Sequence, residues 1–143
     1  MSNLLDEARG RPSCISIIIC NEVIEDKRTN NKTLVSLFNN ITVNEFPCLH
    51  PRLFIMSSFA NGEGQWSFSV IVRSPSGQVL INNTGTMTFN DPLSVLDIVM
   101  EIRGLELTEE GAFFVDVSVD ESDRKSTRLN SSHHAISRMP SSA

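Results

Sequence analysis

The chain has 143 residues, of which 40% are hydrophobic and 20% are charged, a balance typical of one globular domain with its own core. Four of the 12 basic residues and none of the 17 acidic residues lie beyond Asp123, so residues 1–123 carry 8 basic and 17 acidic groups, a net charge of −9. Such an acidic body argues against nucleic acid or an anionic membrane as a partner. No apolar run approaches the roughly 20 residues that span a bilayer. Residues 1–12 lack the features of a secretory signal. The chain has three cysteines, and an odd number argues against a disulfide framework. We expect a cytoplasmic protein.

Residues 1–12 are predicted to be a flexible lead-in, followed by a central strand over 13–24 that is rich in β-branched residues. Its alternation places Ile15, Ile17 and Ile19 on one face and Cys14, Ile18 and Cys20 on the other. Residues 25–32 read as a turn. A second strand is predicted over 33–46, with a bulge near Asn39-Asn40 because its apolar parity drifts.

Residues 47–51 carry two prolines and predict a break. Strands are then predicted over 53–59 and 65–74, and Pro75-Ser76-Gly77 turns the chain. Two shorter strands, 78–81 and 86–89, flank a predicted turn at residues 82–85, which read Asn-Asn-Thr-Gly.

The strongest signal is the alternation over 96–103 and 113–120, joined by a glycine-containing link, which predicts an antiparallel hairpin. Asp91-Pro92 with Gly104 leaves a helix over part of 91–103 as the alternative. We favour a strand, because Leu96, Ile98, Met100 and Ile102 all share one strand parity. Seven or eight short strands with regular turns predict an all-β fold, an antiparallel β-sandwich over residues 13–122.

Several short motifs resemble an uncharacterised bacterial β-sandwich family, a domain of unknown function. The resemblance covers residues 14–120, and its motifs are Cys20-x-x-x-Ile24-x-Asp26, Lys32-x-Leu34-x-Ser36-x-Phe38-x-x-Ile41, Phe46-Pro47, Gly62-x-Gly64, Pro75-x-Gly77-x-Val79, Gly104-Leu105 and Gly111. Every matching residue is a turn, core or strand position, so the resemblance implies architecture and no activity. Here Phe113 stands where the family usually has tyrosine, and the family's further strand after the hairpin is expected to be missing.

Residues 123–143 are rich in serine, contain no acid after Asp123 and show no apolar periodicity. They resemble translated sequencing-adapter read-through of the kind found in metagenomic open reading frames, so we predict a disordered, non-native tail on a truncated domain. Without its native last strand, the strand over 113–120 would expose unpaired backbone groups and promote self-association. A native basic tail is the alternative.

Candidate chemistry is sparse. The only possible set of ligands for a soft metal is Cys14, Cys20, Cys48 and His50. The only pair of a thiol and a base close in sequence is Cys48 with His50. Buried structural cysteines are the commoner outcome. His133 and His134 lie in the suspect tail, and Trp66 falls on the inward parity of its strand, where core packing is the default. Acidic residues near turns suggest calcium only weakly, since none forms a D-x-D-x-D pattern; they are Asp91, Glu109, Glu110, Asp116, Asp120 and Glu121.

The sequence therefore assigns no catalytic, cofactor or metal residue and predicts a protein that is not an enzyme. The expected function is an interaction or assembly module that meets an unknown protein partner or itself through an edge strand or a sandwich face. The alternative is an accessory domain that binds a ligand or calcium through the acidic loops.

Overall fold

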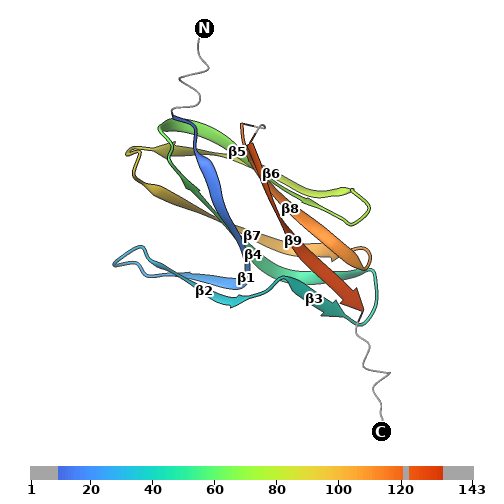
Figure 1. The fold of residues 1–143 in the computed structure, drawn as a ribbon. Helices are drawn as coiled ribbons and strands as arrows, with labels where there is room; N and C mark the ends of the chain where they lie inside the picture. Colours follow the sequence, from blue (N-terminus) through green and yellow to red (C-terminus); the bar gives the residue numbers. More distant parts are fainter. Residues whose placement is uncertain (1–9, 121–122, 134–143) are drawn as a thin grey trace.

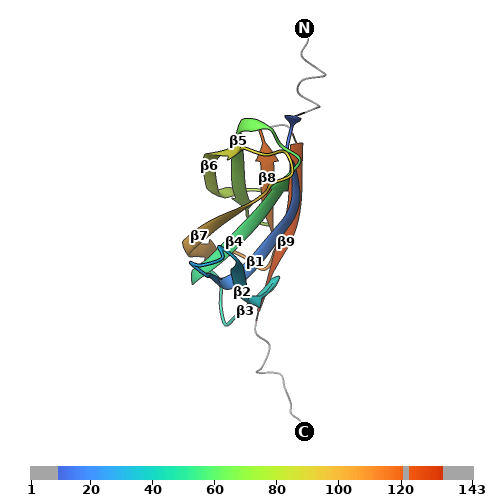
Figure 2. The ribbon, with the colours of Figure 1, turned by 90° about the vertical axis from the view of Figure 1, so that its left-hand side faces the viewer.

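The computed structural model describes residues 10–120 and 123–133, and within them nine β-strands. In chain order these are β1 (Ser13–Glu25), β2 (Lys32–Leu37), β3 (Asn40–Val43), β4 (Cys48–Ala60), β5 (Gly64–Arg73), β6 (Val79–Phe89), β7 (Val95–Leu107), β8 (Gly111–Val119) and β9 (Asp123–His133). One sheet has the order β2-β1-β4-β7 and the other β3-β9-β8-β5-β6, and the two lie against each other as layers (Figures 1 and 2). The predicted all-β sandwich class is confirmed, with one strand more than the upper prediction and one parallel pair, β3 with β9.

The core lies between the two sheets and takes alternate residues from their central strands. Leu53, Ile55 and Phe59 of β4 belong to the same buried cluster as Val72 of β5 and Phe113 of β8. This is the expected result of period-two patterning in a two-layer fold, in which each strand directs one set of side chains inward.

The predicted hairpin between residues 96–103 and 113–120 is wrong. β7 pairs with β4, whereas β8 pairs with β5 and β9, so the two strands belong to different sheets. Each strand was correctly predicted, and the helical alternative for 91–103 is excluded because Val95–Leu107 is one strand with Leu96 and Ile98 both packed against the core. Alternation shows that a strand has one apolar face, but two such faces can meet across the sandwich as well as side by side.

The prediction of a disordered segment beginning at residue 123 is wrong for residues 123–133. They form β9, which pairs antiparallel with the whole of β8, and Leu129 on this strand is 1% exposed in the core. The strand β8 is therefore covered on both sides and is not the exposed edge that the sequence predicted. Residues 134–143 lie outside the described residues, and the non-native origin of the tail stays a prediction.

The predicted single strand over 33–46 is instead two strands in two sheets. β2 ends at Leu37, Ser36 has a positive φ of 58°, and β3 begins at Asn40 beside β9. The drift in apolar parity marks a crossover between sheets and not a bulge.

Residues 82–85 do not turn, because β6 is continuous from Val79 to Phe89. Gly85 pairs with Phe68 of β5, and a Cβ on Gly85 would lie 2.8 Å from the Phe68 ring. The glycine makes room for an aromatic ring on the neighbouring strand, a use of glycine inside strands that resembles a turn signal in the sequence.

The structure has a bulge in β1, which the sequence did not predict, and not the one predicted near Asn39-Asn40. The register against β4 shifts between Cys14 and Ser16, so Ile15 is 50% exposed while Cys14 packs against the core with Ile17 and Ile19. The predicted grouping of Ile15 with Ile17 and Ile19 is therefore wrong, because a bulge reverses the parity on one side of it.

Residues 10–12, the described part of the predicted lead-in, are anchored to the sandwich. Pro12 is fully buried and the Gly10 carbonyl accepts a hydrogen bond of 2.9 Å from the Glu63 amide. Residues 1–9 lie outside the described residues. Among those described, no helix has the length and apolar character needed to cross a bilayer.

Candidate functional site

The structure does not bring the candidate soft-metal residues together. Cys14 pairs with Phe59 in the register of β1 and β4, whereas Cys48 pairs with Leu107 at the far end of β4. No group of three or more His, Cys, Asp or Glu residues in the described part of the chain is placed to hold a metal ion. All three thiols are free.

Burial makes the thiols of Cys14 and Cys20 poor nucleophiles. Desolvation raises the pKa of both, only partly offset by hydrogen bonds to backbone carbonyls at Ser16 and Glu22. A nucleophilic cysteine needs the opposite shift, toward the thiolate.

Cys48 and His50 occupy alternate positions of β4 and are both half-buried. The His50 ring lies 6.0 Å from the ring of Phe38, and burial lowers the pKa of the imidazole, partly offset by a backbone hydrogen bond at Arg52. His50 is thus a packed ring on an apolar neighbour, and no described contact joins it to an acid that would orient it as a general base.

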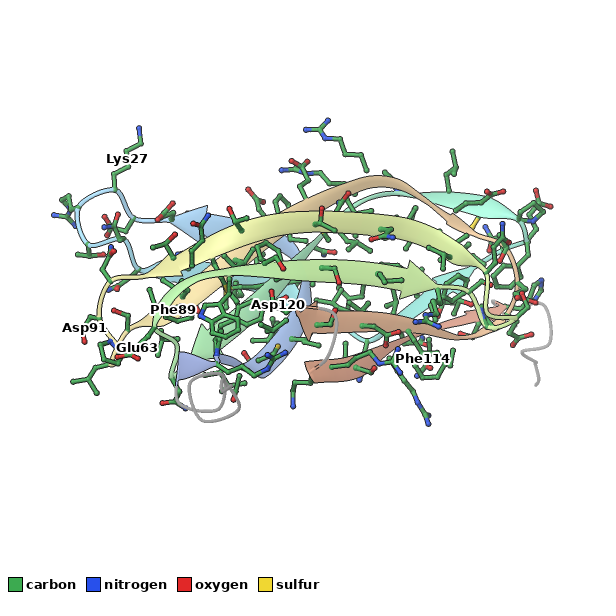
Figure 3. All side chains as sticks on the ribbon, turned by 90° about the horizontal axis from the view of Figure 1, so that it is seen from above. Lys27, Glu63, Phe89, Asp91, Phe114 and Asp120 are labelled. Atoms are coloured by element: carbon green, nitrogen blue, oxygen red, sulfur yellow. The ribbon has the colours of Figure 1, made fainter. Side chains whose placement is uncertain are left out.

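The acidic residues near turns are separated in space. Asp91 lies at one end of the sandwich near Glu63 (Figure 3), and Leu93 donates its amide to Asp91 at 3.0 Å. Glu109 accepts a hydrogen bond of 3.0 Å from the amide of Ser76 in the β5–β6 turn, and Asp120 accepts one of 2.6 Å from the Ser67 hydroxyl. These carboxylates serve separate turns, Glu121 lies outside the described residues, and calcium needs several oxygens converging on one point.

Trp66 packs partly against the core, as its parity predicted. Its indole Nε1 donates to the Glu63 carbonyl at 2.6 Å, and the Arg11 guanidinium lies 5.5 Å from the ring centroid. The ring faces another part of the same chain, so it offers no stacking platform to a ligand.

The outer face of the five-stranded sheet is polar and carries a shallow groove of about 460 Å³. Its central carboxylate is Asp116, which is 7% exposed, pairs with Arg73 at 3.1 Å and Arg124 at 4.0 Å, and accepts a hydrogen bond from Ser126. In the sequence Asp116 stands out only as one of the acidic residues near turns, and its burial was missed because the two arginines come from other strands. We call this surface the polar outer face; its other lining residues are Ser69, Ile71, Asn82, Thr84 and Ser118.

The outer face of the four-stranded sheet has an apolar centre, which the sequence did not predict, and polar side chains along its β4–β7 side. Two cross-strand rows form it, and we call it the apolar outer face. The rows are Ile18–Met56–Val99 and Leu37–Cys20–Phe54–Glu101. Phe54 and Met56 are 8% and 9% exposed although they do not belong to the core cluster between the sheets.

β7 borders this face and forms the edge of the four-stranded sheet. It pairs with β4 from Val95 to Leu107 and has no second strand neighbour among residues 10–120 and 123–133. In an antiparallel sheet the backbone groups of successive residues point alternately to the two sides, so every second residue of β7 directs its N–H and C=O away from β4.

Other strand edges in the described residues are shorter than the β7 edge. β2 has six residues, β3 four and β6 eleven, and β6, like β7, has no lysine or proline. The part of β9 before its pairing with β3 carries Arg124, Lys125 and Arg128. β7 has 13 residues and no lysine or proline, although its charged residues Asp97, Glu101, Arg103 and Glu106 restrict which strands can be added to it.

The charges on the outward positions of β7 are held by neighbours in the same sheet. Asp97 accepts a hydrogen bond of 2.7 Å from the Ser58 hydroxyl. Glu101 lies 2.7 Å from Arg52 and 2.9 Å from Arg103, measured from carboxylate oxygen to guanidinium Nε. The edge thus presents fixed charges of both signs beside the exposed Val95 and Val99.

Comparisons with known proteins give the family of this chain and no activity. Chains of solved β-glucosidases align with this one at a TM-score of 0.44: the enzyme from Erythrobacter marinus at 14% identity over 81% of this chain and 15% of its own, and the Listeria innocua enzyme in complex with isofagomine at 8% identity over 85% and 16%. This chain thus spans less than a fifth of those enzymes, and a likeness of that quality supports no statement about function. No curated protein matches the chain. Residues 15–131 match DUF6941, a family of unknown function, and the chain belongs to that family.

Proposed function

We propose that this domain is a non-catalytic, cytoplasmic interaction module that binds an extended segment of a protein along the unpaired edge of β7. The observation that carries the proposal is the 13-residue length of this unpaired edge, the longest strand edge in the described residues, beside the apolar row Ile18–Met56–Val99. Strand addition at a sheet edge gives affinity through main-chain hydrogen bonds and specificity through alternate side chains.

The surroundings of β7 suit an added strand. Its outward face continues the row Ile18–Met56–Val99, so the apolar side chains of an incoming strand would extend an existing apolar row. A protein partner fits better than nucleic acid or an anionic membrane, since residues 1–123 carry a net charge of −9. Free thiols at Cys14, Cys20 and Cys48 suit a reducing compartment.

A synthetic peptide tests the proposal on the whole chain. The probe is a peptide of ten alternating valine and threonine residues with a lysine at each end, and the readout is the chemical shift of backbone amides in ¹⁵N-labelled protein. We expect changes concentrated in β7 and absent from β6, and binding at least about tenfold weaker for a peptide with proline at its centre, which removes a main-chain donor.

Two matched variants complete the test. Val99 and Val79 are both exposed valines on edge strands, β7 and β6 respectively. Val99→Lys places a lysine on the β7 edge and is expected to weaken peptide binding, whereas Val79→Lys leaves it unchanged. Shift changes on β6, equal effects of the two variants, or no binding up to millimolar peptide would each disprove the proposal.

A further inference from the structure

We infer that the strand that completes the β7 edge is β7 of a second copy of this chain, in an antiparallel register centred on Met100. The inference rests on the proposed function of the edge and names its partner. It is carried by the spacing of the charges on β7, which is self-complementary in this register and not in the neighbouring one.

Symmetry restricts the possible registers. When two identical strands pair antiparallel about a two-fold axis, residues at equal distances from the central residue lie opposite each other, and both have the same parity. The straight part of β7 runs from Val95 to Arg103, because Gly104 has a positive φ of 67° and the burial pattern changes face there, with Ile102 and Leu105 both buried. The centre of an extended pairing must therefore fall near Val99 or Met100.

The charges decide between these centres. A centre at Val99 places Asp97 of each copy directly opposite Glu101 of the other, which opposes like charges. A centre at Met100 places Asp97 of each copy opposite Arg103 of the other and Val99 opposite Glu101, which gives two attractive pairs related by the symmetry axis. Opposite charges at facing positions stabilise a strand pair and like charges destabilise it.

The side chains are available for this pairing. Arg103 is 76% exposed at its side chain, and its Nε contacts Glu101 on the same strand, so the guanidinium lies on the outward face of β7. Asp97 holds one hydrogen bond, from Ser58, and a carboxylate accepts several. In this register Val99 of one copy lies opposite Glu101 of the other. The row Ile18–Met56–Val99 of one copy therefore continues into the row Glu101–Phe54–Cys20–Leu37 of the other, and the apolar outer faces of the two copies become continuous.

Charge reversal with mixing tests the register. In Asp97→Arg two arginines face each other at both symmetric positions, and in Arg103→Asp two aspartates do, so each variant is expected to self-associate at least about tenfold more weakly than the natural chain. In an equimolar mixture, an arginine of one variant faces an aspartate of the other at both symmetric positions. The mixture is therefore expected to form a 1:1 heterodimer. Sedimentation equilibrium of each sample and of the mixture measures both outcomes.

A second measurement uses the more exposed residue alone, in case Asp97→Arg does not fold. Salt should weaken the natural dimer, which gains from opposite charges, and strengthen the residual dimer of Arg103→Glu, in which Asp97 of each copy faces the introduced carboxylate of the other. A natural chain that stays monomeric at several hundred micromolar, a mixture without heterodimer, or the same salt dependence for both proteins would overturn the inference. If the valine–threonine peptide still shifts β7 amides in that event, the edge binds a different partner and only this inference fails.

Discussion

The two outer faces of this sandwich differ in the side chains that cover them. The polar outer face holds a buried carboxylate, Asp116, by arginines from β5 and β9. The apolar outer face carries Phe54 and Met56 at less than a tenth exposed, and the Arg52 guanidinium of the same strand lies over the Phe54 ring. The polar face is thus held by ion pairs, whereas the apolar face is bordered by the long unpaired edge of β7.

The largest effect should come from the apolar outer face. Phe54→Ala removes a ring that is 8% exposed and lies 4.9 Å from the Arg52 guanidinium, so we expect a loss of about 3 kcal/mol in the free energy of unfolding. Urea denaturation measures it. The control is Thr86→Ala, an exposed outward position on the opposite sheet, which should change stability by less than about 0.5 kcal/mol. Equal losses for the two variants would remove the distinction between the faces.

On the polar outer face we expect the carboxylate to matter more than either arginine. Asp116→Ala leaves Arg73 and Ser126 without their shared acceptor, and should cost about 1–2 kcal/mol in urea denaturation. Arg73→Gln should cost less, because Arg124 and Ser126 still contact the carboxylate. A larger loss for Arg73→Gln would show that the arginine stem, and not the ion pair, stabilises this face.

Thiol reactivity tests whether the apolar outer face is closed to water. Cys20 lies on that face and is fully buried, with a raised pKa, whereas Cys48 is half-buried. At pH 8 iodoacetamide should modify Cys20 at least about tenfold more slowly than Cys48, because the reagent needs an accessible thiolate. Mass spectrometry of timed samples reads both sites, and similar rates would mean that the face opens readily.

The smallest effect concerns His50, at the far end of the four-stranded sheet. Its pKa is lowered by burial below the ordinary value of 6.5, so the unfolded chain takes up a proton at a higher pH than the folded chain does. The contribution of His50 to stability is therefore complete above pH 6.5 and is lost as the pH falls from there through the folded pKa. Urea denaturation between about pH 7.5 and 5 should show a decline that His50→Gln reduces, and an unchanged decline would place the effect elsewhere.

The β-strand content could be predicted from the sequence because period-two alternation is a local property. The strand that contains Leu96 and Ile98 was recognised in this way, and so was the strand that contains Phe113 and Val115. Their pairing could not be predicted, because an apolar face does not say whether its partner lies beside it or across the core. The same limit hid the β7 edge, which is an edge only because β8 pairs elsewhere.

Two further errors have a common cause in long-range contacts. Gly85 reads as a turn residue until Phe68 is placed opposite it. Residues 123–133 read as a disordered tail, since Leu129 is the only large apolar residue among them, and become a strand through main-chain pairing with β8. Hydrogen bonds of the backbone need no side-chain pattern, so composition gives little warning of such a strand.

The sequence by itself determined that this chain is a β-protein with an acidic body and inward-facing positions at alternate residues, because each of these follows from composition or from neighbours a few residues apart. Only the tertiary structure decided which strands pair, which face stays apolar and which edge stays open. Those features depend on which distant residues meet, as Asp116 meets Arg73 and Arg124, and no local pattern encodes such a meeting.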